Sequence, residues 1–200
     1  MEHPEECHAL EILKSVFGDC YSTCKTGDRP DIQAENGSCG IEVTRATNPE
    51  RVAASQAMHA DALNSIGDMR KVYSDSVRDK IILKSGGKLY KCHGLPVYET
   101  QCQDAEEVQK IILERIEDKQ GKLSEYSNFE RMQLFVFDET DSYENDLYIK
   151  MINAVLDIYK KNHTSGILFE KIFILKHGIT LYELDIPTGC VEIHQVPNPV

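Results

Sequence analysis

Three carboxylates and one lysine stand where the sequence predicts apolar faces or paired strands: Glu6, Asp31, Glu42 and Lys119. A buried charge is costly unless it is paired or bound to a metal ion. Hard divalent cations such as Mg²⁺ take carboxylate oxygens as ligands, and a bound metal ion lowers the pKa of its water so that hydroxide forms near neutral pH. A nearby lysine would hold that water or stabilise transition-state charge. Together these residue types indicate metal-assisted hydrolysis of a phosphodiester.

Two of the acids lie on a predicted β-hairpin. The segments "RPDIQA" and "CGIEVTRA" flank "ENGS", and Asn-Gly is a strong turn signal. Alternation in the second strand puts Ile41 and Val43 on one face and Glu42 and Thr44 on the other. Glu42 is therefore an acid in the middle of an apolar strand, and Asp31 begins the strand that pairs with it.

The other two polar residues belong to predicted helices. A helix over about residues 4–17 puts Glu6 at i on a face completed at i+4, i+7 and i+11 by Leu10, Leu13 and Phe17. A helix over about residues 104–123 puts Lys119 in a face shared with Ile112, Ile116 and Leu123. Both faces should pack on the core, so the acid and the lysine are expected to point inward.

The order of the elements predicts one α/β domain. Three short strands, beginning with "CYSTCK", follow the first helix; a helix capped by Asn48 and a basic hairpin, "DKIILKSGGKLYK", come next. After the second inward-facing helix, "MQLFVFD" reads as a central strand, followed by an amphipathic helix, a hairpin through His177-Gly178 and a last strand. The 200 residues thus predict a mixed sheet with helices on both faces and an insertion at about residues 47–103.

The segments Pro30-Asp31 and Glu42-Val43-Thr44 resemble the motif of the PD-(D/E)XK nuclease superfamily, which has the restriction-endonuclease-like fold. The family core, αβββαβ with acids on the second and third strands, corresponds to roughly half of this chain. The resemblance implies Mg²⁺ or Mn²⁺ as cofactor, with Asp31, Glu42 and the backbone carbonyl of Val43 as ligands. Glu6 would supply a further carboxylate from the first helix.

The sequence departs from the family at Thr44, where the family motif has lysine. In this superfamily the following helix can supply the cation, so Lys119 is the expected third catalytic residue beside Asp31 and Glu42. Lys122, one turn further on, is the second choice. Gln56, His59, Tyr126 and Asp138 are candidates for the rim of the site.

The charge distribution bears on the partner. The net charge of −11 argues against a general nucleic-acid coat protein. Residues 70–91, however, hold seven basic residues against two acidic ones, and the expected contacts with DNA or RNA are Lys80, Lys84, Lys88 and Lys91. A solvated, lysine-rich hairpin is the alternative.

Each of the three proposed catalytic residues also has a purely structural role open to it. Asp31 would shape the turn after Pro30, Glu42 would pair with Arg45 or another cation on a half-exposed sheet face, and Lys119 would extend its ammonium into solvent. The whole chain would then be an inactive nuclease-like scaffold with a binding or regulatory role, or an acidic protein that mimics nucleic acid.

The remaining features bear on the cellular compartment in which the protein is expected. The acidic N-terminus lacks a secretory pattern, and the longest apolar runs are too short to cross a membrane. The seven cysteines are odd in number and irregular in spacing, which is typical of reduced thiols. A cytoplasmic protein without a membrane partner is expected.

Overall fold

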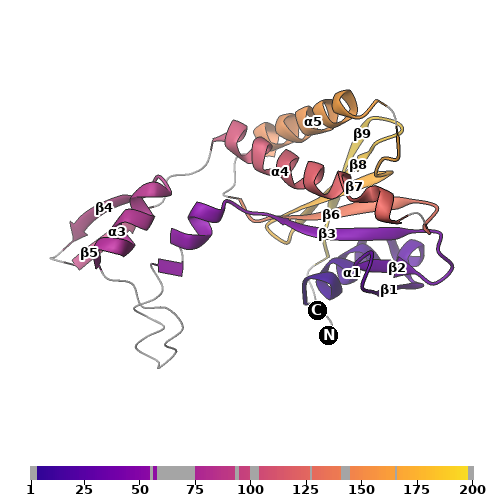
Figure 1. Ribbon diagram of the computed structural model, residues 1–200, viewed down its shortest axis with the longest axis horizontal. Helices are drawn as coiled ribbons and strands as arrows, with labels where there is room; N and C mark the ends of the chain where they lie inside the picture. The colour runs from indigo at the N-terminus through magenta and orange to yellow at the C-terminus, as the bar shows by residue number, and fades with distance from the viewer. Residues whose placement is uncertain are drawn as a thin grey trace. The chain divides into compact units, whose positions relative to one another are not determined.

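The computed structural model describes residues 4–54, 56–57, 75–92, 95–99, 104–126, 128–140, 145–164 and 166–197. The chain divides into two compact units, one made of Met1–Ala46 with Asp104–Val200 and the other of Thr47–Gln103 (Figure 1). The second unit spans the segment for which the sequence predicts an insertion.

The first unit is built on a seven-stranded mixed sheet. Its strand order is β1-β2-β3-β6-β7-β8-β9, in which β3, β6 and β7 are parallel and every other neighbouring pair is antiparallel. The strands are β1 Cys24–Thr26, β2 Ile32–Ala34, β3 Gly40–Ala46, β6 Met132–Asp138, β7 Lys171–Lys176, β8 Thr180–Asp185 and β9 Cys190–Gln195. The predicted α/β class with a mixed sheet is confirmed.

Helices cover both faces of this sheet, as expected (Figure 1). One face carries α1 (Pro4–Phe17), and the other carries α4 (Ala105–Gln120) and α5 (Asn145–Asn162). The ends of the helices follow from local chemistry. Gly18 takes a positive φ of 56° directly after α1, and the Asp104 carboxylate accepts from the Glu107 backbone N–H at 2.8 Å to cap α4.

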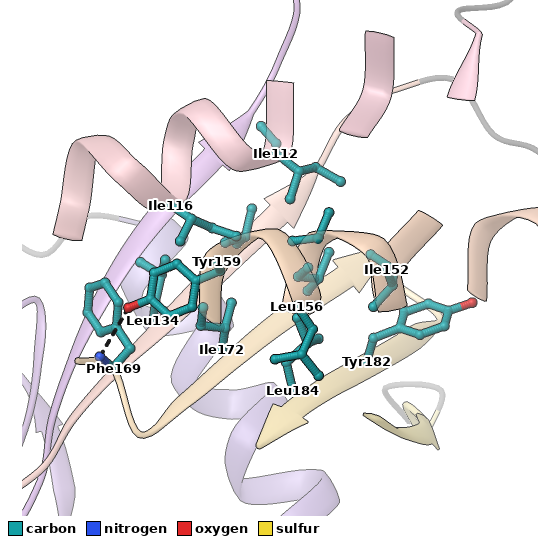
Figure 2. Packing of buried hydrophobic residues seen from close by; sticks show 14 of the residues in the cluster. Ile112, Ile116, Leu134, Ile152, Leu156, Tyr159, Phe169, Ile172, Tyr182 and Leu184 are labelled. Atoms are coloured by element: carbon teal, nitrogen blue, oxygen red, sulfur yellow. Dashed lines mark hydrogen bonds between the residues drawn. The ribbon is translucent and has the colours of Figure 1, made fainter. Parts of the chain in front are cut away.

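The larger core lies between the sheet and the pair α4 and α5. Figure 2 shows isoleucines and leucines from these helices interleaved with Leu134, Ile172 and Leu184 of the strands. The Tyr159 hydroxyl accepts from the Phe169 backbone N–H at 3.4 Å within the same cluster. Because both faces are covered, β6 is buried along nearly its whole length, which is why its sequence is almost continuously apolar.

The alternation predicted for β3 is present. Ile41 and Val43 pack in the smaller core under α1, whereas Ala46, which shares its face with Glu42 and Thr44, packs in the core under α4. Glu42 therefore lies on the α4 side of the sheet.

Two strand predictions need correction. Residues 20–25 were expected to be extended, but a 3₁₀ helix, η1 Gly18–Tyr21, precedes the short β1, and its turn is closed by the Ser22 N–H donating to the Asp19 carbonyl. The basic hairpin predicted from Asp79 is also wrong in its first half, because α3 occupies Asp75–Lys84. Arg78 and Ile82 are buried four residues apart, which is helical spacing, and a short apolar run does not distinguish helix from strand.

The second unit also contains a hairpin, formed by β4 Lys88–Cys92 and β5 Leu95–Glu99. Gly86, with a φ of 78°, ends α3 through two backbone bonds, Gly87 N–H to the Ile82 carbonyl and Gly86 N–H to the Leu83 carbonyl. Residues 49–54 and 56–57 are helical, and the side chain of Asn48 accepts from the backbone N–H groups of Glu50 and Arg51 as predicted.

Candidate functional site

The centre of the candidate site is an ion pair between a strand and a helix. Lys119 Nζ of α4 lies 2.6 Å from Glu42 Oε2 of β3, and the exposed fractions of the two side chains are 21% and 4%. The expected approach of Lys119 to Glu42 is therefore present. Lys119 reaches inward because Ile112 and Ile116, on the same face of α4, are fully buried against the sheet.

Tyr126 completes the surroundings of Glu42. It lies in η2 (Leu123–Tyr126), the 3₁₀ turn that follows α4, and its hydroxyl hydrogen-bonds to the Glu42 carboxylate. Burial raises the pKa of this phenol, and the nearby negative charges of Glu42 and Asp31 raise it further. The hydroxyl is therefore protonated at neutral pH and donates to the carboxylate. The sequence marked Tyr126 only as a rim candidate, because polarity was the only signal.

Asp31 stands beside the peptide that joins Glu42 to Val43. Its Oδ2 accepts from the Val43 backbone N–H at 2.7 Å. The ladder between β2 and β3 pairs Ile32 with Ile41 and Gln33 with Gly40, so this carboxylate continues the hydrogen bonding of β3 beyond the start of β2. Asp31 thus has a structural contact in addition to the role predicted for it.

The first-helix acid lies elsewhere. Glu6 is half-buried on α1, which packs against the sheet face opposite to Glu42. Among the described residues, Glu6, Asp31 and Glu42 do not form a group whose ligand atoms all lie within 4.8 Å of one another. Of the predicted metal ligands, Asp31 contacts Val43 through the backbone N–H of that residue, next to Glu42.

Of the structural partners considered for Glu42, Arg45 is engaged elsewhere, whereas a pair with another cation is present in the contact with Lys119. Arg45 pairs with Glu5 at 2.7 Å and with Glu139 at 3.0 Å, on the face of β3 opposite to Glu42. The alternative in which Lys119 extends into solvent does not occur either, since its nitrogen contacts Glu42. Lys122 follows α4 and is exposed.

Asp138, a further rim candidate, lies apart from Glu42 along the sheet. Asp138 pairs with Ala46 in the parallel ladder, four residues along from the pairing of Glu42 with Leu134. Its buried carboxylate accepts from Thr140 Oγ1 at 2.5 Å and from the Tyr148 hydroxyl at 2.6 Å. Gln56 belongs to the second unit, and His59 lies outside the described residues.

The predicted nucleic-acid contacts also belong to the second unit, whereas Asp31, Glu42 and Lys119 belong to the first. Lys80, Lys84 and Lys88 are exposed, and Lys84 pairs with Glu50 at 2.9 Å. The backbone of Lys91 lies in β4, while Arg70 and Lys71 lie outside the described residues. The basic excess of this segment is thus partly neutralised within its own unit.

A second buried glutamate was missed by the sequence reasoning. Glu183 in the middle of β8 is almost as deeply buried as Glu42 and contacts Lys171 and His194. The same signal, an acid inside the apolar segment "LYELDI", was present for it.

Comparison of the chain with protein-family models, with curated proteins and with solved structures gave no match. In the part of the chain that the structure describes, every helix is too short or too polar to cross a membrane. Cys7, Cys20, Cys24, Cys39 and Cys190 are free thiols.

Proposed function

We propose that Asp31, Glu42 and Lys119 form the site of a metal-dependent phosphodiester hydrolase acting on nucleic acid. The observation that carries the proposal is the 2.6 Å contact between Lys119 and Glu42, which brings a cation from a helix to an acid held inside a strand. We expected this contact because the family motif has a lysine at the position where this chain has Thr44.

The order of elements supports the same proposal. The chain runs α1, β1, β2, β3, α4, β6, with β3 parallel to β6, once the second unit is set aside. This is the αβββαβ order of the restriction-endonuclease-like core that the motif resembles. The fold we propose is a divergent member of that class, with the second unit inserted between β3 and α4.

The donor chemistry fits Mg²⁺ or Mn²⁺. The Asp31 carboxylate accepts from the backbone N–H of Val43, the residue directly after Glu42, and both carboxylates offer only oxygen atoms. One oxygen of each carboxylate already accepts a hydrogen bond, from Val43 and from Lys119 respectively. When bound, the ion would neutralise the phosphodiester and activate a water molecule.

The chain's own residues have distinct roles in this proposal. Lys119 would donate to the phosphoryl oxygens as negative charge develops, since its ammonium is fixed by Glu42 and partly shielded from water. Tyr126, whose pKa is raised, keeps its proton and orients the Glu42 carboxylate. Tyr126 is therefore a positioning residue.

The test is cleavage of mixed single- and double-stranded DNA and RNA in Mg²⁺ or Mn²⁺. Wild type should cut one of these substrates, and Asp31→Asn or Lys119→Met should slow turnover by about 100-fold or more, the scale for loss of one preorganised donor. Lys122→Met is the matched control, because this lysine is exposed just after the helix that carries Lys119. Absence of cleavage by wild type, or wild-type turnover in Asp31→Asn, would refute the proposal.

A second candidate function is an inactive nuclease-like scaffold with a binding role. The observation that favours it is the near-complete burial of Glu42, whose carboxylate is already bonded to Lys119 and Tyr126. Titration calorimetry with Mn²⁺ separates the two candidates. Equal heats for wild type and Glu42→Gln would favour the scaffold, whereas loss of the heat in the variant would favour the hydrolase.

A further inference from the structure

A second cluster of charged and metal-ligating side chains lies on the α1 face of the sheet, at its β9 edge. Glu183 of β8 and Glu192 of β9 are direct cross-strand partners, and His194 of β9 pairs with Leu181. Since side chains alternate along a strand, Glu192 and His194 both project from the face that carries Glu183. The register of one antiparallel pair thus brings two carboxylates and an imidazole together.

The ligand atoms of this cluster lie close enough together to reach one ion. His194 Nε2 lies 2.8 Å from Glu183 Oε2 and 3.9 Å from Glu192 Oε2. One ligand atom from each of the three residues falls within 4.8 Å of the other two. Ligand atoms at about 2.0–2.2 Å from one tetrahedral ion are about 3.4 Å apart, so the observed distances bracket the required spacing.

The charges of the cluster call for a further cation. Like charges directly opposite each other on neighbouring strands destabilise a sheet, and Glu183 and Glu192 are such a pair. Lys171 contacts the other oxygen of Glu183, Oε1, and so leaves Oε2 directed at His194. A lysine on the distant oxygen is the kind of outer contact that orients a ligating carboxylate.

We propose that Glu183, Glu192 and His194 bind one divalent transition-metal ion of the Zn²⁺ type. Two carboxylate oxygens and one imidazole nitrogen are a donor set that suits this class of ion, whereas Mg²⁺ prefers oxygen alone. Glu183 is buried and fixed, His194 packs edge-on against the Phe17 ring at 4.9 Å, and Glu192 is exposed. Because Glu192 is exposed, solvent would reach the ion from its side.

The experiment is titration calorimetry of the reduced, full-length chain with Zn²⁺. Wild type should bind Zn²⁺, and Glu192→Gln and His194→Gln should each weaken the binding at this site by at least about tenfold. Glu192→Gln is the sharper variant, because the residue is exposed and the substitution keeps its volume. His8→Gln, which removes an exposed imidazole from α1, should leave the affinity unchanged.

A second measurement distinguishes Zn²⁺ binding at this cluster from Zn²⁺ binding by cysteine thiols. The His194 imidazole protons are assigned in the NMR spectrum as the signals that disappear in His194→Gln. Substoichiometric Zn²⁺ should shift these signals in the wild-type protein. Unchanged signals, or equal Zn²⁺ affinity in wild type and both variants, would overturn the proposal and assign any bound Zn²⁺ to the cysteines. Glu42→Gln should retain the wild-type Zn²⁺ affinity, so this result is independent of the hydrolase test.

Discussion

Two glutamates, Glu42 and Glu183, lie in the middle of apolar strands on opposite faces of one sheet. Each is almost fully buried and each contacts a lysine and a second polar side chain. The partners of Glu42, Lys119 and Tyr126, come from a helix and turn packed over the sheet. The partners of Glu183, Lys171 and His194, come from the two strands beside it.

A buried acid is thus stabilised in two ways in the same sheet. The Glu42 cluster depends on tertiary packing, because Lys119 is 77 positions away and arrives only when α4 docks on the sheet. The Glu183 cluster depends on strand register, because Lys171 and His194 are 12 and 11 positions away in adjoining strands. Loss of one partner should therefore cost more at Glu42.

The largest effect is expected for Lys119→Met. It removes the ammonium paired with a buried carboxylate, so the free energy of unfolding should fall by about 3 kcal/mol, near the lower end for breaking a buried pair. Urea denaturation followed by circular dichroism measures this value. The double variant Lys119→Met/Glu42→Gln should recover part of the loss, and no recovery would mean that the ion pair is not the cause.

A smaller loss is expected for Lys171→Met. Glu183 keeps its 2.8 Å contact with His194, so unfolding should become easier by about 1–2 kcal/mol. The same denaturation experiment applies, with Lys25→Met, in an exposed ion pair with Glu35, as the control that should change little. A loss at Lys171 as large as that at Lys119 would break the contrast between the two clusters.

Tyr126→Phe should cost about 1 kcal/mol, since it deletes one hydrogen bond to a carboxylate that keeps Lys119. Its second consequence is optical. The deprotonation of Tyr126, whose pKa is raised, should disappear from the high-pH absorbance titration of the folded protein. If removing Tyr126 instead deletes a tyrosine that titrates in its ordinary range, the contact with Glu42 is absent.

The smallest effect is expected at the turn that sets the β8–β9 register. The Thr188 side-chain hydroxyl and backbone N–H both donate to the Asp185 carboxylate and lower the pKa of that group. A lowered folded-state pKa stabilises the fold above the unfolded pKa of about 3.9, and this contribution is lost as the pH falls through the folded value.

Thr188→Val should therefore destabilise the protein by about 0.5–1 kcal/mol at pH 7, because one hydrogen bond to Asp185 is lost. The difference from wild type should shrink as the pH falls below about 4. Denaturation at several pH values measures it. A difference that grows toward low pH would show that the hydroxyl does not act through the Asp185 carboxylate.

Much of the fold was predictable from local pattern. Pro4–Phe17, the central strand Met132–Asp138, the hairpin through His177-Gly178 and the last strand were all predicted where they occur, because their periodicity and turn residues act over short distances. The helix at Asp75–Lys84 was missed, since three consecutive apolar residues are compatible with either state and the burial of Ile82 decides between them.

Local pattern was also enough to predict that Glu42 and Lys119 face inward, because alternation and helical period fix the direction of a side chain relative to its own element. Which charges meet was set by the tertiary structure. It docked α4 on the Glu42 face and α1 on the other, so Lys119 reaches Glu42 while Glu6 stays on the opposite side. It also set the register that joins Glu183, Glu192 and His194. Contacts between elements depend on the packing of the whole core, which no local pattern encodes.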